Sequence, residues 1–197
     1  MDAQKPPRVV VLAGINGAGK TTASADLLER VLKIPTFVNA DTIARGLNGL
    51  NPEAEAFRAG RIMLDRLNDL AARREDFAFE TTLAARTYAG WLESLRAVGY
   101  DVYLYYYWLD SPDLAIARVA ARVQSGGHFV PADTVRQRYA RSIRNFFELY
   151  RKLAVVWDVY DNSYGQRTLV AFGSTDVEEL VVDEERWAVF QRSRADE

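Results

Sequence analysis

The chain has no cysteine, only one histidine and no long run of apolar residues. Without cysteine there is neither a disulfide nor a thiolate metal site, and a single histidine argues against a zinc centre. The longest aromatic and apolar run, VYLYYYWL, is far shorter than the roughly 18 residues that cross a bilayer, and the first residues do not read as a secretory signal. We therefore expect a cytoplasmic protein that makes no contact with a membrane.

The chain also has no large excess of either charge, because its 25 lysines and arginines nearly balance its 27 aspartates and glutamates, which gives a net charge of −2. This balance argues against general nucleic-acid binding, although charge can gather locally. The length suits a single domain covering residues 1–197, and there is no repeat or low-complexity segment. We expect residues 1–7 and 192–197 to be ragged ends.

Five apolar runs have the character of buried parallel strands, and they are Arg8–Ala13, Thr36–Asn39, Phe77–Phe79, Asp101–Leu109 and Thr168–Phe172. Helix-length segments lie between them, among them TTASADLLERVL, AEAFRAGRIMLDRLNDLAARR, TYAGWLESLRAVG and SPDLAIARVAARVQ. Strands that alternate with helices predict an α/β fold with right-handed crossovers. We therefore expect a central parallel sheet of about five strands, with helices on both faces and ligands at the carboxyl ends of the strands.

The segment GINGAGKT matches the phosphate-binding pattern GxxxxGK[ST] between a strand and a helix. A loop without Cβ atoms wraps closely around a phosphate, and the start of the helix adds partial positive charge. The motif predicts a P-loop NTPase or kinase fold that binds ATP and Mg²⁺, with Lys20 on the phosphates and the hydroxyl of Thr21 on the metal. The expected nucleotide contacts are Gly14, Asn16, Gly17, Ala18, Gly19, Lys20, Thr21 and Thr22.

Other classes of glycine-rich loop fit less well. The glycine spacing is not the GxGxxG of dinucleotide-binding turns, where a Lys-Thr pair would have no role. The segment QSGGHFV resembles the signature of ABC transporters, but it follows the VYLYYYWLD strand instead of preceding it. Guanine-specific NKxD and switch-type DxxG elements are absent. These observations favour a kinase.

Asp41 follows the predicted strand FVNA and is expected at the same edge of the sheet as the phosphate loop. In small-molecule kinases an acid at this place accepts the proton of the attacking hydroxyl. The alternative role for Asp41 is to cap the helix that begins at TIARGL, and the two roles are compatible. We assign Asp41 as the candidate base and place Asn39 beside it in the acceptor site.

A second cluster of polar residues lies at and after the end of the strand FAFE, and it contains Glu80, Thr82 and Arg86. These side chains are expected at the carboxyl edge, where they hold a polar substrate or the water shell of magnesium. Capping is the alternative for the threonines. The second protein ligand of magnesium stays open among Asp41, Glu80 and Asp110, since Asp110 ends a long strand but also suits a helix cap.

The segment from Arg118 to Lys152 holds eight basic residues and two acidic ones. We expect residues 118–145 to form an arginine-rich lid that neutralises the transferring phosphoryl group. The candidate catalytic arginines are Arg122 and Arg138, with Arg141 on the acceptor, while Arg136, Arg144 and Arg151 suit a solvated face. Adjacent glycines in SGGHFVP suit a hinge that presents His128, for which a structural hydrogen bond is the alternative.

Together these residues resemble the zeta-toxin family of P-loop kinases, in particular its short bacterial members. The resemblance covers about residues 8 to 165 and rests, in this order, on GINGAGKTT, FVNADTIA, FAFETTLAAR, RVAARVQSGGHFVP and VRQRYARSIRNF. It implies a cytoplasmic kinase that uses ATP and magnesium to phosphorylate a hydroxyl of a UDP-activated amino sugar, with UDP-N-acetylglucosamine as the acceptor. An antitoxin protein is the implied partner.

The resemblance also implies roles for individual residues. Lys20 and Thr21 match the residues that hold ATP and magnesium, and Asp41 matches the base of the family. The matches to the acceptor-binding strand end are Glu80, Thr82 and Arg86, and the matches to the phosphate-clamping arginines are Arg122 and Arg138. The chain is shorter than the best-described toxins and has no counterpart to their extra helices around the sugar nucleotide, which leaves the acceptor open.

Two other functions remain open at this point. The first is a kinase for another acceptor, such as a nucleoside, an aminoglycoside-like sugar or an RNA end, since a basic lid suits any phosphate-bearing molecule. The second is an ATP-dependent binding switch without a small-molecule acceptor. The stretch Asp161-Asn162-Ser163 either lies near the adenine or forms a turn.

Overall fold

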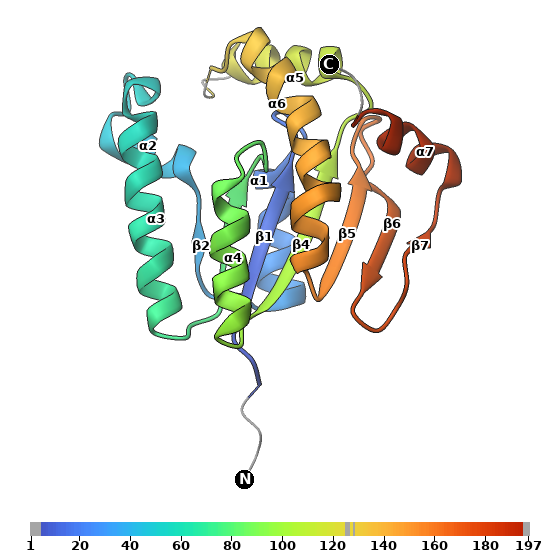
Figure 1. The fold of residues 1–197 in the computed structure, drawn as a ribbon. Helices are drawn as coiled ribbons and strands as arrows, with labels where there is room; N and C mark the ends of the chain where they lie inside the picture. The colour runs from blue at the N-terminus through green and yellow to red at the C-terminus, as the bar shows by residue number, and fades with distance from the viewer. Residues whose placement is uncertain (1–4, 125–126, 128, 195–197) are drawn as a thin grey trace.

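The glycine-rich segment follows an inner strand of a seven-stranded sheet (Figure 1). A computed structural model describes residues 5–124, 127 and 129–194 of the chain. The strand order is β2-β3-β1-β4-β5-β6-β7. The strands are β1 (Arg8–Gly14), β2 (Phe37–Val38), β3 (Phe77–Thr81), β4 (Asp101–Trp108), β5 (Val156–Asp161), β6 (Thr168–Ser174) and β7 (Leu180–Val181).

The first five strands run parallel, and β6 and β7 add an antiparallel edge. The predicted fold class is confirmed, but the sheet has seven strands and one assignment was wrong. Thr168–Phe172 lies in β6, which is antiparallel, and the fifth parallel strand is β5. The sequence VWDVYD of β5 contains two aspartates, so it does not read as a continuous apolar run.

The helices follow the predicted segments, and α7 is an addition near the C-terminus. Two of the helical stretches, η1 and η3, have the wider π-helical winding. The bounds are α1 (Lys20–Ala25), η1 (Asp26–Leu32), α2 (Ala40–Leu47), η2 (Pro52–Glu55), α3 (Ala56–Ala72), α4 (Thr87–Ala97), α5 (Pro112–Gln124), α6 (Ala132–Asn145), η3 (Phe146–Tyr150), η4 (Arg151–Leu153) and α7 (Glu184–Arg192).

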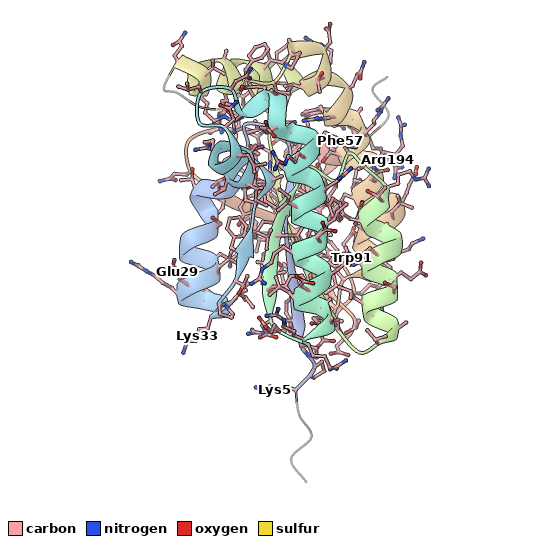
Figure 2. The ribbon with its side chains drawn as sticks, turned by 90° about the vertical axis from the view of Figure 1, so that its left-hand side faces the viewer. Lys5, Glu29, Lys33, Phe57, Trp91 and Arg194 are labelled. Carbon is pink, nitrogen blue, oxygen red and sulfur yellow. The ribbon has the colours of Figure 1, made fainter. Side chains whose placement is uncertain are left out.

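The helices cover both faces of the sheet. In Figure 1, α4 and α6 lie in front of the sheet, and α1 with η1 lies behind it. The side view of Figure 2 shows α3 along the β2 edge, with α4 and η1 on opposite sides. The basic segment 118–145 includes most of α5 and all of α6, and the two helices meet above the carboxyl ends of the strands (Figure 1). This places arginines over the edge where the phosphate loop lies.

An aromatic cluster fixes α6 and α7 to the sheet. Phe146 stands edge-on to Trp157 of β5 at 5.8 Å between ring centroids, and Trp157 stacks on Trp187 of α7 at 6.0 Å. Phe190 is fully buried against Phe146 at 5.6 Å. Each such pair contributes about 0.5–1.5 kcal/mol beyond its buried area. The helix that carries Arg138 is therefore rooted in the core at its C-terminal end.

Residues near both ends of the described chain make hydrogen bonds to the rest of the protein. The backbone N–H of Asp101 donates to Pro7 O at 2.9 Å, and Ser193 is buried with its hydroxyl donating to Val189 O. Of the segments expected to be ragged, 1–7 and 192–197, residues 5–7 and 192–194 belong to the described chain, and residues 1–4 and 195–197 lie outside it. Among the residues that the structure describes, none of the helices has the length and apolar character needed to span a membrane.

Candidate active site

The phosphate loop joins β1 to α1 through glycines whose backbone is left-handed. Gly14, Gly17 and Gly19 have φ values of 129°, 79° and 78°. A Cβ atom on Gly14 would lie 2.0 Å from Tyr107 O, and one on Gly19 would lie 2.8 Å from Asn162 Nδ2. Both the conformation and the space therefore require glycine, and the loop packs directly against β4 and the turn after β5.

Lys20 is buried at the start of α1 with its ammonium group against the loop. Its Nζ donates to Gly14 O and Ile15 O, each at 3.0 Å, and lies 3.6 Å from Glu80 Oε1. Burial lowers the pKa of Lys20, and the charges of Glu80 and Asp41 counter this effect. The lysine is thus held by carbonyl oxygens that phosphate oxygens of a nucleotide would replace.

Glu80 connects three elements at the carboxyl edge. Its Oε2 accepts hydrogen bonds from Thr21 Oγ1 at 2.7 Å and from Asn39 Nδ2 at 2.8 Å. Within the described residues there is no group of three or more histidine, cysteine, aspartate or glutamate side chains suited to a metal ion. A hydroxyl and a carboxylate in contact still fit Mg²⁺, which binds nucleotide sites through one or two protein oxygens and the phosphates.

Asn39 caps α2, and the capping role considered for Asp41 is wrong. The backbone of Asn39 is extended, with φ −136° and ψ 123°, and its Oδ1 accepts from Thr42 N at 3.1 Å. The helix therefore begins at Ala40, two residues earlier than the pattern indicated. Asp41 lies in the first turn, where its half-buried carboxylate is not used as the cap.

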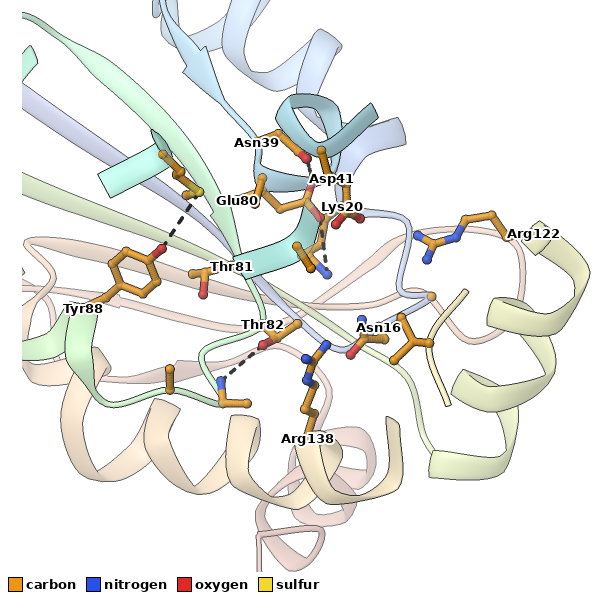
Figure 3. A pocket seen from close by; sticks show the side chains of 18 residues that line it. Asn16, Lys20, Asn39, Asp41, Glu80, Thr81, Thr82, Tyr88, Arg122 and Arg138 are labelled. Carbon is orange, nitrogen blue, oxygen red and sulfur yellow. Dashed lines mark hydrogen bonds and ion pairs between the residues drawn. The ribbon is translucent and has the colours of Figure 1, made fainter. Parts of the chain in front are cut away.

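A cavity of about 350 Å³ opens beside these groups (Figure 3). It brings together residues from the phosphate loop, α2, α3, β3, α4 and the two helices of the basic segment. Its lining consists of Asn16, Gly17, Lys20, Asn39, Ala40, Asp41, Ala44, Ala56, Met63, Glu80, Thr81, Thr82, Ala84, Ala85, Tyr88, Arg122, Val130 and Arg138. In Figure 3, Arg122 and Arg138 approach the Lys20 side of the cavity from different helices.

Several predicted residues do not line this cavity. Arg86 lies at the start of α4 and borders another hollow with Glu93 and Lys152, because the chain turns at Leu83, where φ is 58°. Arg141 is exposed on α6 and is absent from the lining of this cavity. His128 lies outside the described residues.

The remaining residues of the loop prediction lie next to the cavity instead of along it. Thr21 reaches it through its bond to Glu80, whereas Thr22 is exposed. Gly14, Ala18 and Gly19 belong to the loop but are not among the lining residues. Asn16 does line the cavity, and its buried Oδ1 has no hydrogen-bond partner among the described residues. A buried amide group without a partner suits contact with a bound molecule.

Three polar residues that the sequence did not single out hold the loop after β3. Ser142 donates to Thr82 O, and Asn145 Nδ2 donates to Leu83 O at 2.7 Å and to Ala84 O at 3.3 Å. One turn further, Tyr150 donates to Ala85 O at 2.5 Å, and burial raises its pKa to about 12. Scattered polar residues on a helix read as a solvated face, so the local sequence contains no signal for this contact.

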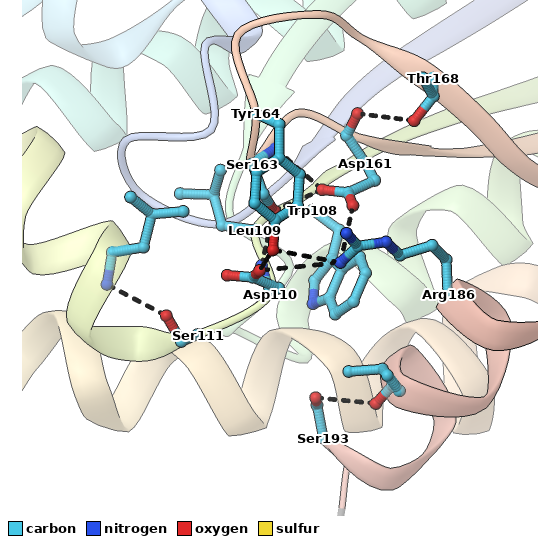
Figure 4. Close-up of polar contacts among 12 residues, drawn as sticks. Trp108, Leu109, Asp110, Ser111, Asp161, Ser163, Tyr164, Thr168, Arg186 and Ser193 are labelled. Carbon is cyan, nitrogen blue, oxygen red and sulfur yellow. Dashed lines mark hydrogen bonds and ion pairs between the residues drawn. The ribbon is translucent and has the colours of Figure 1, made fainter.

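Asp110 belongs to a separate network (Figure 4). Its carboxylate accepts from the hydroxyl of Tyr164 and lies 3.7 Å from Arg186 Nη1, and Arg186 also approaches Asp161 at 3.5 Å. The guanidinium of Arg186 lies 4.5 Å from the centre of the Tyr164 ring. The pKa of Arg186 is raised, and the largest cause is its hydrogen bond to Tyr164. Asp110 is not among the cavity-lining residues, so the structure does not support it as a magnesium ligand.

The stretch Asp161-Asn162-Ser163 forms a turn, one of its two predicted roles. Asp161 Oδ1 accepts from Ser163 N at 2.8 Å and from the hydroxyl of Ser163. Asn162 Nδ2 donates to Ala18 O at 2.8 Å, which ties this turn to the phosphate loop. Its proximity to an adenine stays a prediction.

Comparison with known proteins agrees with this architecture. A family model described as an AAA domain, AAA_33, matches residues 9–149, which include the phosphate loop, Asp41, Glu80 and both cavity arginines. The chain belongs to this AAA domain family. An uncharacterized protein of Haemophilus influenzae is 29% identical to it over 132 residues, which are 67% of this chain and 92% of that protein.

Solved structures show the fold of this AAA domain. A chain of the AvrRxo1-ORF1:-ORF2 complex with ATP matches with a TM-score of 0.74 and 13% identity, over 95% of this chain and 64% of that chain. A chain of the PezAT chromosomal toxin-antitoxin system of Streptococcus pneumoniae matches at 0.60 and 17%, over 98% and 87%. A gluconokinase from Sinorhizobium meliloti 1021 matches at 0.51 and 16%, over 98% and 96%. The AAA domain thus has a P-loop kinase fold and spans less than two thirds of the AvrRxo1 chain.

Proposed function

We propose that the protein is an ATP- and magnesium-dependent kinase of the zeta-toxin type. It transfers the γ-phosphate of ATP to a hydroxyl of a UDP-activated amino sugar similar to UDP-N-acetylglucosamine. The observation that supports this proposal is one cavity lined by Lys20, Asp41, Glu80, Arg122 and Arg138. A phosphate-binding lysine, two carboxylates and two arginines around a common space are the parts that phosphoryl transfer uses.

The nucleotide side consists of the phosphate loop and its neighbours. Lys20 exchanges its bonds to Gly14 O and Ile15 O for phosphate oxygens, and the carboxylate of Glu80 keeps the lysine in place. Thr21 and Glu80 are the residues that would hold Mg²⁺, since their oxygens are already in contact at 2.7 Å. When bound, magnesium neutralises charge on the β- and γ-phosphates.

The acceptor side is centred on Asp41. An acceptor hydroxyl attacks the γ-phosphorus, its proton passes to the Asp41 carboxylate, the new O–P bond forms, and the bond to the β–γ bridging oxygen breaks as ADP leaves. Arg122 and Arg138 neutralise the negative charge that is spread over the transferring group. Thr82 lies on the same cavity and contributes a hydroxyl for the acceptor. Arg86 and Arg141 do not line this cavity, and the role of His128, which lies outside the described residues, stays a prediction.

The comparisons support parts of this proposal. The likeness to a chain of the PezAT toxin-antitoxin system supports the toxin class and, with it, an antitoxin as the protein partner. The AvrRxo1 complex with ATP supports ATP as the donor. The likeness to a gluconokinase favours a second candidate, a kinase for a small polyhydroxy acid. We place the proposed reaction in the cytoplasm, where ATP and nucleotide sugars are available.

One experiment tests the proposal. The purified protein is incubated with ATP, magnesium and separate acceptors: UDP-N-acetylglucosamine, UDP-glucose, gluconate, a nucleoside and an RNA with a free 5′ hydroxyl. Mass spectrometry then detects the added phosphate. We expect a phosphorylated product from UDP-sugars. Phosphate found only on gluconate, the nucleoside or RNA would replace the proposed acceptor, and ATP hydrolysis without any phosphorylated acceptor would indicate a binding switch.

A further inference from the structure

The phosphate loop has a contact that lies outside the candidate active-site cavity. Asn162, in the turn after β5, donates from Nδ2 to Ala18 O at 2.8 Å, and Asn162 is not among the residues that line the cavity. A Cβ atom on Gly19 would lie 2.8 Å from the same Nδ2, so the amide rests directly against the loop. The side chain of Asn162 therefore contacts the peptide group that joins Ala18 to Gly19.

This peptide group determines where one donor of the phosphate loop points. A trans peptide is planar, so the carbonyl oxygen of Ala18 and the N–H of Gly19 point in opposite directions. Gly19 has a φ of 78°, and glycine adopts both signs of φ at little cost, so the loop alone does not prevent rotation of this peptide group. The hydrogen bond from Asn162 holds Ala18 O on the side of the turn and the N–H of Gly19 on the opposite side. Successive backbone N–H groups of such a loop are its phosphate ligands.

Hydrogen bonds within and around the turn fix the position of Asn162. The backbone N–H of Asn162 donates to Trp108 O, at the end of β4, at 3.0 Å. Asp161, which is 2% exposed, accepts from Ser163 N at 2.8 Å, and Asp110 N donates to the hydroxyl oxygen of Ser163 at 2.9 Å. The turn is thus held against the end of β4, and its asparagine meets the loop in one orientation.

Arg186 of α7 supplies positive charge to this turn (Figure 4). Its Nη1 lies 3.5 Å from Asp161 Oδ2 and 3.7 Å from Asp110 Oδ2. The hydroxyl of Tyr164 donates to Asp110, and the Tyr164 ring stacks on the guanidinium. A buried carboxylate that loses its cation is strongly destabilised. Removal of Arg186 would therefore loosen the turn that carries Asn162.

We infer that Asn162 and Arg186 are positioning residues that set the affinity of the phosphate loop for polyphosphate. Asn162 acts through the peptide group between Ala18 and Gly19, and Arg186 acts through the turn that carries Asn162. The inference rests on the proposed function in one respect, the binding of ATP by this loop, and it names two residues outside the cavity on which that binding depends. A contact of Asn162 with the adenine is the competing role, and it would affect recognition of the base instead of the phosphates.

Asn162→Ala tests the hydrogen bond to the loop with two probes, ATP and inorganic tripolyphosphate, each with magnesium. Tripolyphosphate carries the phosphates of ATP without the adenosine. Calorimetry on the full chain should show that the Kd rises about fivefold for both probes, as for the loss of one neutral hydrogen bond. A rise for ATP alone would assign Asn162 to the base and overturn the inference. An unchanged Kd for both probes, or a parent protein that does not bind tripolyphosphate, would also overturn it.

Asn162→Asp and a control variant separate the donor from the size of the side chain. The aspartate keeps the shape of asparagine but has no N–H to donate, so the Kd for tripolyphosphate should rise at least as far as in Asn162→Ala. Asn68→Ala removes an asparagine whose Oδ1 accepts from Trp91 Nε1 at 2.9 Å, between α3 and α4, and should leave the Kd of both probes unchanged. The Kd of the parent protein in Asn162→Asp would show that the donor has no role.

The kinetic signature distinguishes positioning from general damage to the site. Asn162→Ala should raise the KM for ATP and leave kcat and the KM for the acceptor unchanged, because the bond acts equally on the ground state and the transition state. A parallel loss of kcat and acceptor binding would overturn the inference. The calorimetric measurements need no transfer, so the expected changes in Kd without any phosphorylated acceptor would retain the inference and reject the kinase function.

A double-mutant cycle tests whether Arg186 acts through Asn162. Arg186→Gln should raise the Kd for tripolyphosphate in the parent protein and have little further effect in Asn162→Ala, because the effects of residues in one network are not additive. Arg186→Lys keeps the charge and should restore part of the affinity, and Arg192→Gln, at an exposed position on the same helix, is the control. Additive effects, or an unchanged Kd in Arg186→Gln, would overturn the role of Arg186.

Discussion

At the scale of single residues, Asn39 and Asp41 have different roles on the acceptor side of the site: Asn39 caps a helix, and Asp41 faces the cavity. Asn39 uses Oδ1 to cap α2 and Nδ2 to hold Glu80. Both ends of its amide are therefore engaged, and the carboxylate of Asp41 is left to the cavity. An aspartate that capped the helix would spend its oxygens on backbone N–H groups and would accept a proton less readily.

Asp41→Asn should abolish phosphoryl transfer and leave ATP binding nearly intact. The amide keeps the size of the side chain but cannot accept the hydroxyl proton, and a general base contributes about 10²–10⁴-fold to the rate. Single-turnover transfer and ATP binding by calorimetry are the measurements, with Asp65→Asn on the exposed face of α3 as control. Equal transfer rates for Asp41→Asn and the parent protein would remove Asp41 from the mechanism.

Glu80→Gln should raise the magnesium concentration that gives half-maximal activity. The amide oxygen can still accept from Thr21 and Asn39, but the negative charge that favours the cation is lost. Magnesium titrations of the transfer rate give the measurement. Glu93→Gln, on the exposed side of α4, should leave the titration unchanged. An unaltered magnesium requirement in Glu80→Gln would assign the metal to other oxygens.

At the scale of elements, α6 and its π-helical extension η3 connect the basic segment to the loop after β3, residues 82–85, which we call the acceptor loop. Arg138 lies near the cavity, and Ser142, Asn145 and Tyr150 donate to the carbonyl oxygens of residues 82–85 further along the same helical run. The carbonyl groups of this loop therefore accept their hydrogen bonds from side chains of α6 and η3. Movement of α6 would shift the arginine and the acceptor loop together.

Asn145→Ala should lower the free energy of unfolding by about 1–3 kcal/mol, because one buried and one partly buried carbonyl group lose their donor. The reduction should be visible in urea denaturation. The control is Gln137→Ala, an exposed position on the same helix. Similar free energies of unfolding for these two variants would show that water replaces the amide of Asn145 at little cost.

The sequence predicted those parts of the fold and site that have a local signature. Phosphate loop, strand ends and helix lengths follow from short patterns, and Lys20, Asp41 and Glu80 do line one cavity. The sequence did not predict β5, because a strand that ends in an aspartate does not read as buried. Hydrogen bonds from Ser163 allow Asp161 to be buried, and a strand pattern does not reveal such a contact. The contact of Asn145 with the acceptor loop joins residues 62 apart in the chain, and such distant pairings leave no mark in the nearby sequence.

At the scale of the whole molecule, the buried tyrosines make stability dependent on alkaline pH. Burial raises the pKa of Tyr105, Tyr106 and Tyr160, and that of Tyr150 to about 12. A raised pKa means that the folded state keeps its proton longer than the unfolded state, whose tyrosines titrate near pH ~10. The stabilisation is therefore complete below pH ~10 and is lost as the pH rises through the folded values.

The free energy of unfolding should consequently decline steeply from pH ~10 to 12. Urea denaturation across this range measures the slope. Tyr150→Phe should reduce the slope, because one of the groups that release a proton on unfolding is gone. Tyr164→Phe alters a ring that is 67% exposed and should keep the slope of the parent protein. Parallel slopes for the parent and Tyr150→Phe would show that Tyr150 does not contribute to the decline.

The two outermost strands of the sheet, β2 and β7, are each two residues long. An open strand edge serves as a template on which a neighbouring molecule can add its own backbone, and this is how β-aggregates grow. Two-residue edges offer such a neighbour little to pair with, and the carboxylate of Glu178 lies two residues before β7. The short β2 and β7 therefore disfavour edge-to-edge pairing between folded molecules.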